Sequence, residues 1–153
     1  MKRKFLSLGK QPIANAFRKI DDNSQEYFFN LDVVFDDQSK LVSLETFVEP
    51  EMMFNDEYVY HSSMSNTMRD HFKSIALSLK DIFSPKKVME IGSNDGVFIR
   101  HFNKEDVTAV EPCGNFAKMT NDMGYKTYEK FWNEERFSNN YTIKIKADFY
   151  LLF

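Results

Sequence analysis

Cysteine occurs only once in the 153 residues, as Cys113. A single cysteine excludes an internal disulfide and any metal site built from a cluster of cysteines. Long apolar runs are also missing, since none approaches the roughly 20 residues that a membrane-spanning helix requires. The basic start of the chain is interrupted by Gly9 and Pro12 before the apolar core of a signal peptide could form. We therefore expect a soluble, cytoplasmic protein without a membrane partner.

Excess charge of one sign is absent as well. The chain has 20 lysines and arginines against 23 aspartates and glutamates, for a formal net charge of -3. The basic residues are spread along the chain and form no stripe of the kind that binds nucleic acid, so we expect no nucleic-acid partner. A hydrophobic fraction of 42% with 28% charged residues is typical of a globular protein. The length allows one ordinary domain or two small ones.

The first 60 residues are punctuated by turn-forming residues. Clusters at positions 21–24 and 36–39 flank short apolar runs at 28–34 and 41–44. This pattern predicts short strands joined by loops. We therefore expect residues 1–60 to form a small irregular or β domain.

The hydrophobic period changes after this region. Apolar side chains then recur at steps of three and four residues, at Met64, Met68, Phe72, Ile75, Leu79 and Ile82. This spacing is typical of an amphipathic helix, and Pro85 ends it. The pattern predicts a linking helix over residues 61–84, with core packing as the role of the apolar stripe.

Strand and helix patterns alternate in the rest of the chain. Strands are predicted at 88–91, 107–111 and 125–128, a turn at 92–96, a short helix at 97–102 and a helix at 115–123. The apolar segment 147–153 predicts a fourth strand. A βαβαβ order indicates a parallel sheet with right-handed crossovers. We expect an α/β fold in which residues 85–153 form a partial Rossmann-like domain.

The turn after the first of these strands has the features of a ligand-binding loop. It lies at the carboxyl end of a strand, where open α/β sheets bind ligands, and Gly92 and Gly96 permit a tight turn and close approach. Glu111 ends the next strand, 21 residues after Glu90. An acidic residue at this spacing commonly accepts the ribose hydroxyls of an adenosine cofactor. The simpler alternative is that the loop is only a turn and Glu111 only a solvated strand end.

Charge then distinguishes between adenosine cofactors. Glu90 and Asp95 flank the loop, and two carboxylates would repel a pyrophosphate by up to a few kcal/mol at an effective dielectric constant near 20. They would attract the ammonium of S-adenosylmethionine instead. The loop also lacks the full G-x-G-x-x-G pattern and the lysine of a P-loop. The methyl donor is therefore the favoured cofactor.

Four stretches of the sequence, at residues 8–17, 54–65, 90–96 and 110–115, resemble in this order the sugar C-methyltransferases. Those enzymes methylate a carbon next to the ketone of nucleotide-linked keto-deoxysugars, so the resemblance implies a nucleotide-linked sugar as substrate. It also implies that S-adenosylmethionine is bound by Gly92, Asn94, Asp95 and Glu111. By its place in the motif, Asn115 would lie near the adenine side of the site.

The tyrosine-rich segment before the linking helix belongs, in that family, to the surface that faces the substrate. Tyr58 and Tyr60 are the matching residues and are our candidates for catalysis. A phenol can donate a hydrogen bond to the sugar ketone or to the enolate that develops from it. His61 and His71 lie nearby, and a lone histidine beside an amphipathic helix is more often structural.

The chain departs from the family pattern in two respects. The family holds its N-terminal domain with a cysteine-bound zinc ion, but positions 35–38 read Phe-Asp-Asp-Gln here, so we expect no structural zinc. Family members also continue past the fourth strand and carry their general base there. We therefore expect a truncated chain that is inactive alone, which a second polypeptide could complete. The alternative is a non-catalytic module that binds S-adenosylmethionine, a nucleotide or another protein.

Overall fold

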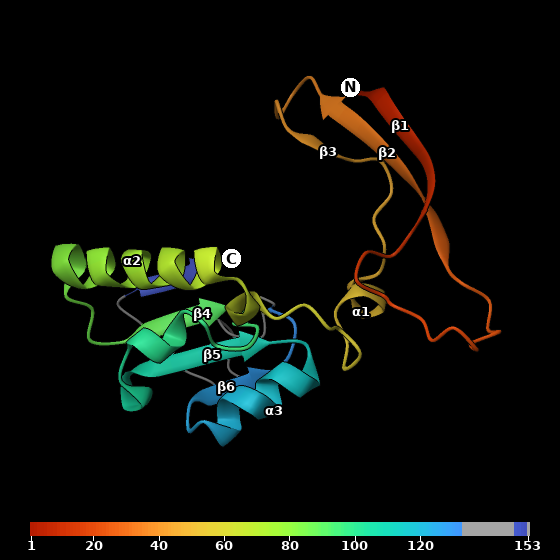
Figure 1. The fold of residues 1–153 in the computed structure, drawn as a ribbon. Helices are drawn as coiled ribbons and strands as arrows, with labels where there is room; N and C mark the ends of the chain where they lie inside the picture. The colour runs from red at the N-terminus through yellow and green to blue at the C-terminus, as the bar shows by residue number, and fades with distance from the viewer. Residues whose placement is uncertain (133–148, 153) are drawn as a thin grey trace, which may run out of the picture. The chain divides into compact units, whose positions relative to one another are not determined.

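The computed structural model describes residues 1–132 and 149–152. The chain divides into two compact units, Met1–Phe54 and Asn55–Phe153, which we call unit 1 and unit 2. Each unit has its own β-sheet (Figure 1). The chain therefore combines an antiparallel sheet with a parallel sheet and its helices, which confirms the mixed α/β class predicted from the sequence.

Unit 1 is built on a three-stranded antiparallel sheet in the order β1-β2-β3. The strands are β1 (Lys2–Pro12), β2 (Phe28–Asp36) and β3 (Val42–Leu44), and the short helix α1 (Pro50–Met53) follows them. Val34 is the most deeply buried apolar side chain of β2. The β2 and β3 strands fall at the two apolar runs that the sequence analysis identified.

The long strand β1 was not predicted. Gly9 looked like an interruption, but its φ of 70° and a register shift between Ser7 and Lys10 form an irregularity within the strand. Glycine tolerates such a bulge at no steric cost, so the pairing with β2 continues on both sides of it. Pro12 ends the strand because it has no N–H to donate to the ladder.

Unit 2 is built on a four-stranded parallel sheet in the order β6-β5-β4-β7. The strands are β4 (Val88–Ile91), β5 (Val107–Glu111), β6 (Lys126–Glu129) and β7 (Phe149–Leu152). The parallel pairing agrees with the βαβαβ pattern. The third strand begins one residue later than predicted, and positions 147, 148 and 153 of the predicted fourth strand lie outside the described residues.

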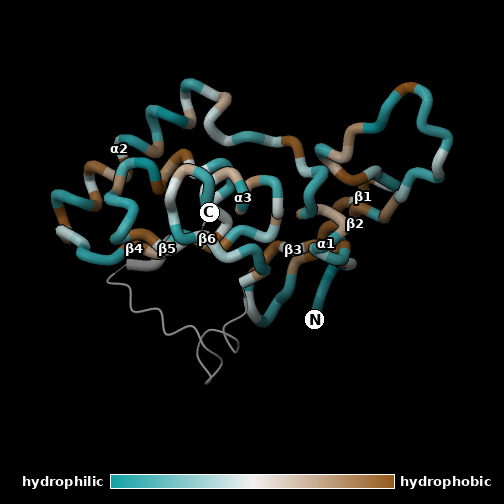
Figure 2. Tube along the Cα trace, turned by 90° about the horizontal axis from the view of Figure 1, so that it is seen from below, coloured by the Kyte–Doolittle hydropathy of each residue, from teal (hydrophilic) through white to brown (hydrophobic). Residues whose placement is uncertain are grey.

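Helix α2 (Asn66–Phe83) is the predicted amphipathic helix, shortened at both ends. Ser65 caps its N-terminus by accepting a hydrogen bond from the Met68 backbone N–H at 3.3 Å. Ser84 ends it in the left-handed conformation, and Pro85 follows. The alternation of polar and apolar residues along α2 is visible in Figure 2, and its apolar side supplies Phe72 and Ala76 to the core.

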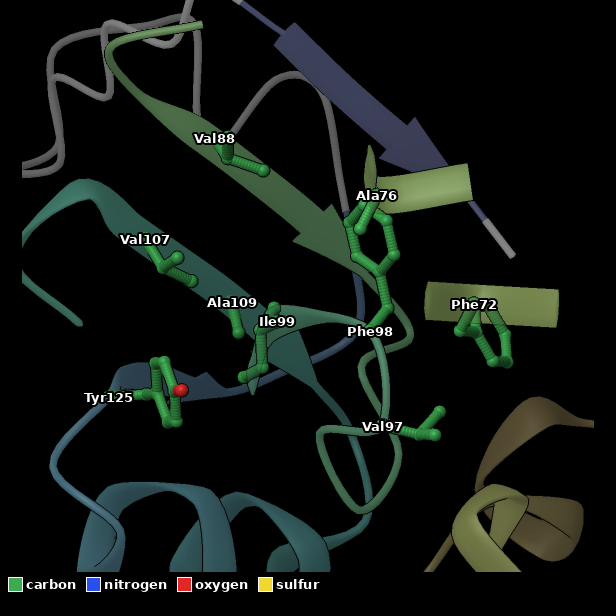
Figure 3. Packing of buried hydrophobic residues seen from close by; sticks show 9 residues of the cluster. All are labelled: Phe72, Ala76, Val88, Val97, Phe98, Ile99, Val107, Ala109 and Tyr125. Carbon is green, nitrogen blue, oxygen red and sulfur yellow. The ribbon is translucent and has the colours of Figure 1, made fainter. Parts of the chain in front are cut away.

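The main core lies on one face of the parallel sheet, where α2 and the segment after β4 pack against β4 and β5 (Figure 3). The Phe98 ring lies 6.1 Å from the Phe72 ring, measured between centroids, and Ala76 belongs to the same cluster. The other described helices of unit 2 are α3 (Gly114–Asp122) and the 3₁₀ turns η1 (Ser62–Met64), η2 (Ile99–His101) and η3 (Lys104–Asp106).

The helix predicted over residues 97–102 is wrong, because only the 3₁₀ turn η2 forms there. Val97, Phe98 and Ile99 are all fully buried. Successive residues of an α-helix are rotated by about 100°, so three neighbours cannot all face one core. Tight packing of this apolar triplet therefore overrides the helical pattern.

Candidate cofactor site

The loop at residues 92–96 turns sharply away from the carboxyl end of β4. Gly92, Asn94 and Gly96 all have positive φ, at 78°, 47° and 77°. The Gly92 N–H donates to the Val110 carbonyl at 2.8 Å and so extends the ladder between β4 and β5 by one residue. The Gly96 N–H donates to the Ser93 carbonyl at 2.9 Å and closes the turn. The two glycines are thus required for the turn that the sequence predicted here.

Gly96 also has little room for a side chain. A Cβ atom at this position would lie 3.0 Å from Thr120 Cγ2 on α3 and 3.3 Å from Ile99 Cγ1. Glycine is therefore needed both for the backbone conformation and for the close packing of the loop against α3.

Arg100 fixes the same loop from the side. Its Nε donates to the Gly96 carbonyl at 3.1 Å, and its Nη2 donates to the Asp95 carbonyl at 3.1 Å. Arg100 is not among the site residues predicted from the sequence. Its position four residues after the second glycine was the available signal, because that spacing lets a side chain reach back over one helical turn.

Glu111 lies at the end of β5, and its side chain links the loop at residues 92–96 to the segment between β5 and α3. Its Oε2 accepts a hydrogen bond from the Asn94 backbone N–H at 2.6 Å, and its Oε1 accepts one from the Cys113 N–H at 2.9 Å. Only 4% of Glu111 is exposed, so the alternative that it is a solvated strand end is wrong. Each carboxylate oxygen can accept a second hydrogen bond, which leaves Glu111 able to hold a ligand hydroxyl.

Three further polar atoms at this end of the sheet are buried without a hydrogen-bond partner among the described residues. They are Glu90 Oε2, Ser93 Oγ and Asp95 Oδ1. The three residues are at most 2% exposed. Leaving a buried polar atom unsatisfied costs about 1–3 kcal/mol, so such atoms are rare in folded proteins. Their concentration at one loop fits a site whose ligand supplies the missing hydrogen bonds.

The charge state of Glu90 differs from the one assumed in the sequence analysis. Burial raises the pKa of the Glu90 carboxyl well above its usual value, and the Glu111 and Asp95 carboxylates raise it further. The neutral acid is therefore favoured over a wider pH range than in an exposed glutamate. The negative charge that opposes a pyrophosphate rests on Asp95 and Glu111, and Glu90 is a potential hydrogen-bond donor.

Residues 56–63, which we call the strap, cross the loop just before α2. The Asn94 side chain is bound on both sides, since its Nδ2 donates to the Tyr60 carbonyl at 2.9 Å and its Oδ1 accepts from the Ser62 N–H at 2.9 Å. Asp95 Oδ2 accepts from the Ser63 N–H at 3.0 Å. These contacts join residues more than 30 positions apart in the sequence.

The other end of the strap is attached to the start of α3. Asp56 Oδ1 accepts a hydrogen bond from the Gly114 N–H at 2.9 Å, and Asn115 Nδ2 donates to the Tyr58 carbonyl at 3.0 Å. The Tyr58 ring meets the Phe116 ring edge to face, with the centroids 6.3 Å apart. The strap therefore runs from the first turn of α3 to the loop after β4.

His61, which the sequence analysis considered structural, is in contact with this site. Its Nδ1 lies 3.6 Å from Asp95 Oδ2, and its ring packs edge to face on Phe116 at 4.8 Å. His71 instead lies on α2 next to Phe72. A histidine is therefore placed beside the loop, and its proximity to Asp95 could not be read from sequence spacing.

The structure brings the sequence-predicted residues together at the carboxyl ends of β4 and β5. The residues predicted to bind the cofactor line this region, at Glu90, Gly92, Asn94, Asp95, Gly96, Glu111 and Asn115. Asn115 is the second residue of α3 rather than the first. Tyr58 and Tyr60 join the region through their backbone carbonyls, and the Tyr60 residue is 44% exposed.

Two comparisons with known proteins cover both units. A family model described as "Putative zinc binding domain" matches residues 1–54. The C-methyltransferase NovU of Streptomyces niveus is 30% identical over 128 residues, or 80% of this chain, a share that no single unit could supply. The predicted relationship to the C-methyltransferases is confirmed. The chain spans 30% of the length of this relative.

The family model that matches unit 1 implies a bound zinc ion, but unit 1 of this C-methyltransferase-like chain lacks the side chains that usually bind zinc. Residues 1–54 contain no cysteine and no histidine, the usual ligands of structural zinc. Over residues 1–132, the structure gathers no group of three acidic, histidine or cysteine side chains that could hold a metal ion. We therefore derive no role for zinc here.

Among the described residues, no helix is both long enough and apolar enough to cross a bilayer.

Proposed function

We propose that unit 2 binds S-adenosylmethionine at the carboxyl ends of β4 and β5, as a partial Rossmann-like domain, and that the chain is the donor-binding part of a sugar C-methyltransferase. The acceptor would be a nucleotide-linked ketosugar. The similarity to a C-methyltransferase and the polar arrangement around the loop both support this function.

One observation carries the proposal. Glu90 Oε2, Ser93 Oγ and Asp95 Oδ1 are buried and unsatisfied at the loop, and the Glu111 carboxylate lies at the end of the adjacent strand. An amino acid ammonium would supply donors to the acceptors among these atoms. Glu111 would accept ribose hydroxyls while it still holds the loop through Asn94.

The chain's own residues would bind and orient the donor and exclude water from it. S-Adenosylmethionine, when bound, supplies an electrophilic methyl group on a sulfonium. The phenol of Tyr60 is our candidate for donating a hydrogen bond to the acceptor's ketone oxygen, with Tyr58 as the second. Carbon methylation beside a ketone also needs a general base within hydrogen-bond reach. We assign no described residue to that role, so we expect binding rather than turnover from this chain alone.

Isothermal titration of the purified chain with S-adenosylmethionine tests the proposal. We expect saturable binding that Glu111→Gln weakens at least tenfold, because an amide nitrogen would replace one acceptor oxygen. The matched control is Glu105→Gln, which changes an exposed carboxylate in η3, just before β5 begins. Fluorescence of Trp132 in unit 2 would verify that each variant is folded.

The choice of cofactor is tested by a second titration with NAD⁺. The carboxylates of Asp95 and Glu111 should disfavour its pyrophosphate, so we expect no saturation at concentrations that saturate the methyl donor. A folded chain that fails to bind S-adenosylmethionine would overturn the proposal. Tighter binding of NAD⁺ would instead identify a dinucleotide site.

A further inference from the structure

The strap occupies the side chains that the proposed cofactor site would use. Both polar groups of the Asn94 side chain, and one oxygen of Asp95, are hydrogen-bonded to strap backbone. The unsatisfied atoms of Glu90, Ser93 and Asp95 are buried, and each of these residues is at most 2% exposed. A ligand with the size of S-adenosylmethionine cannot reach these atoms while every group of the site stays where it is.

The attachment of the strap to α3 is separate from those atoms. Asp56 Oδ1 accepts from the Gly114 N–H at the first residue of α3. A Cβ atom on Gly114 would lie 2.5 Å from Asp56 Oδ1, closer than non-bonded atoms approach, and 3.0 Å from Glu129 Oε1. Gly114 does not have a positive φ, so its backbone does not require glycine. The absence of a side chain at Gly114 is thus what allows Asp56 to bind there.

We propose that the strap is a gate over the cofactor site, with the hydrogen bond between Asp56 and Gly114 as its latch. The inference rests on the proposed function for its ligand. The strap opens to admit the cofactor and closes across Asn94 behind it. The latch therefore slows both entry and release, and it changes the affinity much less than it changes the rates.

Two variants break the latch from opposite sides. Asp56→Ala removes the acceptor, and Gly114→Ala displaces Asp56 with a methyl group. Their effects on α3 are opposed, because the first removes a carboxylate from the helix N-terminus and the second replaces glycine by a better helix former. A shared effect on binding would therefore come from the latch. The matched control is Glu57→Ala, which removes the neighbouring exposed carboxylate.

Stopped-flow measurement of S-adenosylmethionine binding to the full chain tests the gate. We expect both latch variants to raise the association and dissociation rates roughly three- to tenfold, the effect of losing one hydrogen bond to an exposed charged acceptor. The dissociation constant is the ratio of the two rates. Because both rates rise together, it should change less than about threefold. The double variant should match either single variant, and Glu57→Ala should match the wild type.

Hydrogen exchange of the Ser62 and Ser63 amides, which bind Asn94 and Asp95, measures strap opening without any ligand. We expect faster exchange in both latch variants, by a similar three- to tenfold factor. Unchanged exchange or unchanged rates in both variants would overturn the gate, even if the cofactor binds. Faster exchange in chains that bind no S-adenosylmethionine would overturn the proposed function and keep the opening of the strap.

Discussion

Replacement of Glu90 by glutamine should stabilise unit 2 at neutral pH. Glu90 is the third residue of β4 and is 2% exposed. Burial is the main cause of its raised pKa, and the Glu111 and Asp95 carboxylates add to it. Glutamine has nearly the same volume and never ionises, so the substitution removes the cost of charging this position while it leaves the packing intact.

The pH dependence has a definite sign. The unfolded Glu90 carboxyl loses its proton near its ordinary pKa of 4.5, whereas the folded protein holds that proton to a higher pH. Between these two values the folded state binds more protons, so the free energy of unfolding falls as the pH rises. The slope contributed by this group is at most about 1.4 kcal/mol per pH unit. The variant lacks this loss, and its advantage grows through the interval.

Urea unfolding of the wild type and Glu90→Gln from pH 5 to pH 8 measures the effect. The single tryptophan, Trp132, belongs to unit 2 and reports its unfolding by fluorescence. In a thermal melt of the same two proteins, each 1 kcal/mol of added unfolding free energy would raise Tm by about 4–8 °C for a unit of roughly 100 residues. Glu105→Gln, an exposed control in η3, should show no such pH-dependent gain. A stability difference between wild type and Glu90→Gln that does not change with pH would refute the reasoning.

Two further predictions concern the loop and unit 1. Gly96→Ala should lower the free energy of unfolding by about 1–3 kcal/mol, because alanine is strained at the positive φ and its Cβ would crowd Thr120 and Ile99. Urea unfolding measures this change, and an unchanged midpoint would contradict the prediction. Unit 1 should keep its circular-dichroism spectrum and its melting temperature after dialysis against EDTA, because residues 1–54 have no cysteine or histidine to hold zinc. Stoichiometric zinc in the purified chain, by elemental analysis, would refute that expectation.

The parts of the fold that sequence predicted well are those where local pattern and tertiary packing agree. The three- and four-residue spacing around Phe72 predicted α2, and Ser65 and Pro85 are consistent with its ends. The alternation of strand and helix predicted the parallel sheet. The spacing of Glu90 and Glu111 placed two acidic residues on neighbouring strand ends, and their pairing in a parallel sheet brings those ends together.

The parts that sequence missed depend on contacts between distant residues. Gly9 interrupts the basic start of the chain in the sequence, and its role as a bulge exists only once β1 pairs with β2. The segment starting at Val97 was read as a helix because its burial on consecutive positions depends on α2. The latch joins Asp56 to Gly114 across 58 positions, and no local pattern marks such a pair.

With Glu90 as a neutral acid, a pyrophosphate is still expected to be disfavoured at the loop, because of its hydrogen-bonding groups. A pyrophosphate offers only acceptors, whereas Asp95 Oδ1 needs a donor and Glu111 is already an acceptor for two backbone N–H groups. Glu90 as a neutral acid could donate one hydrogen bond to a phosphate, which is too little to offset two nearby carboxylates. An amino acid ammonium, which a dinucleotide lacks, supplies a donor where Asp95 Oδ1 has none. We therefore expect hydrogen-bond complementarity, more than the count of acidic residues, to favour the methyl donor at this loop.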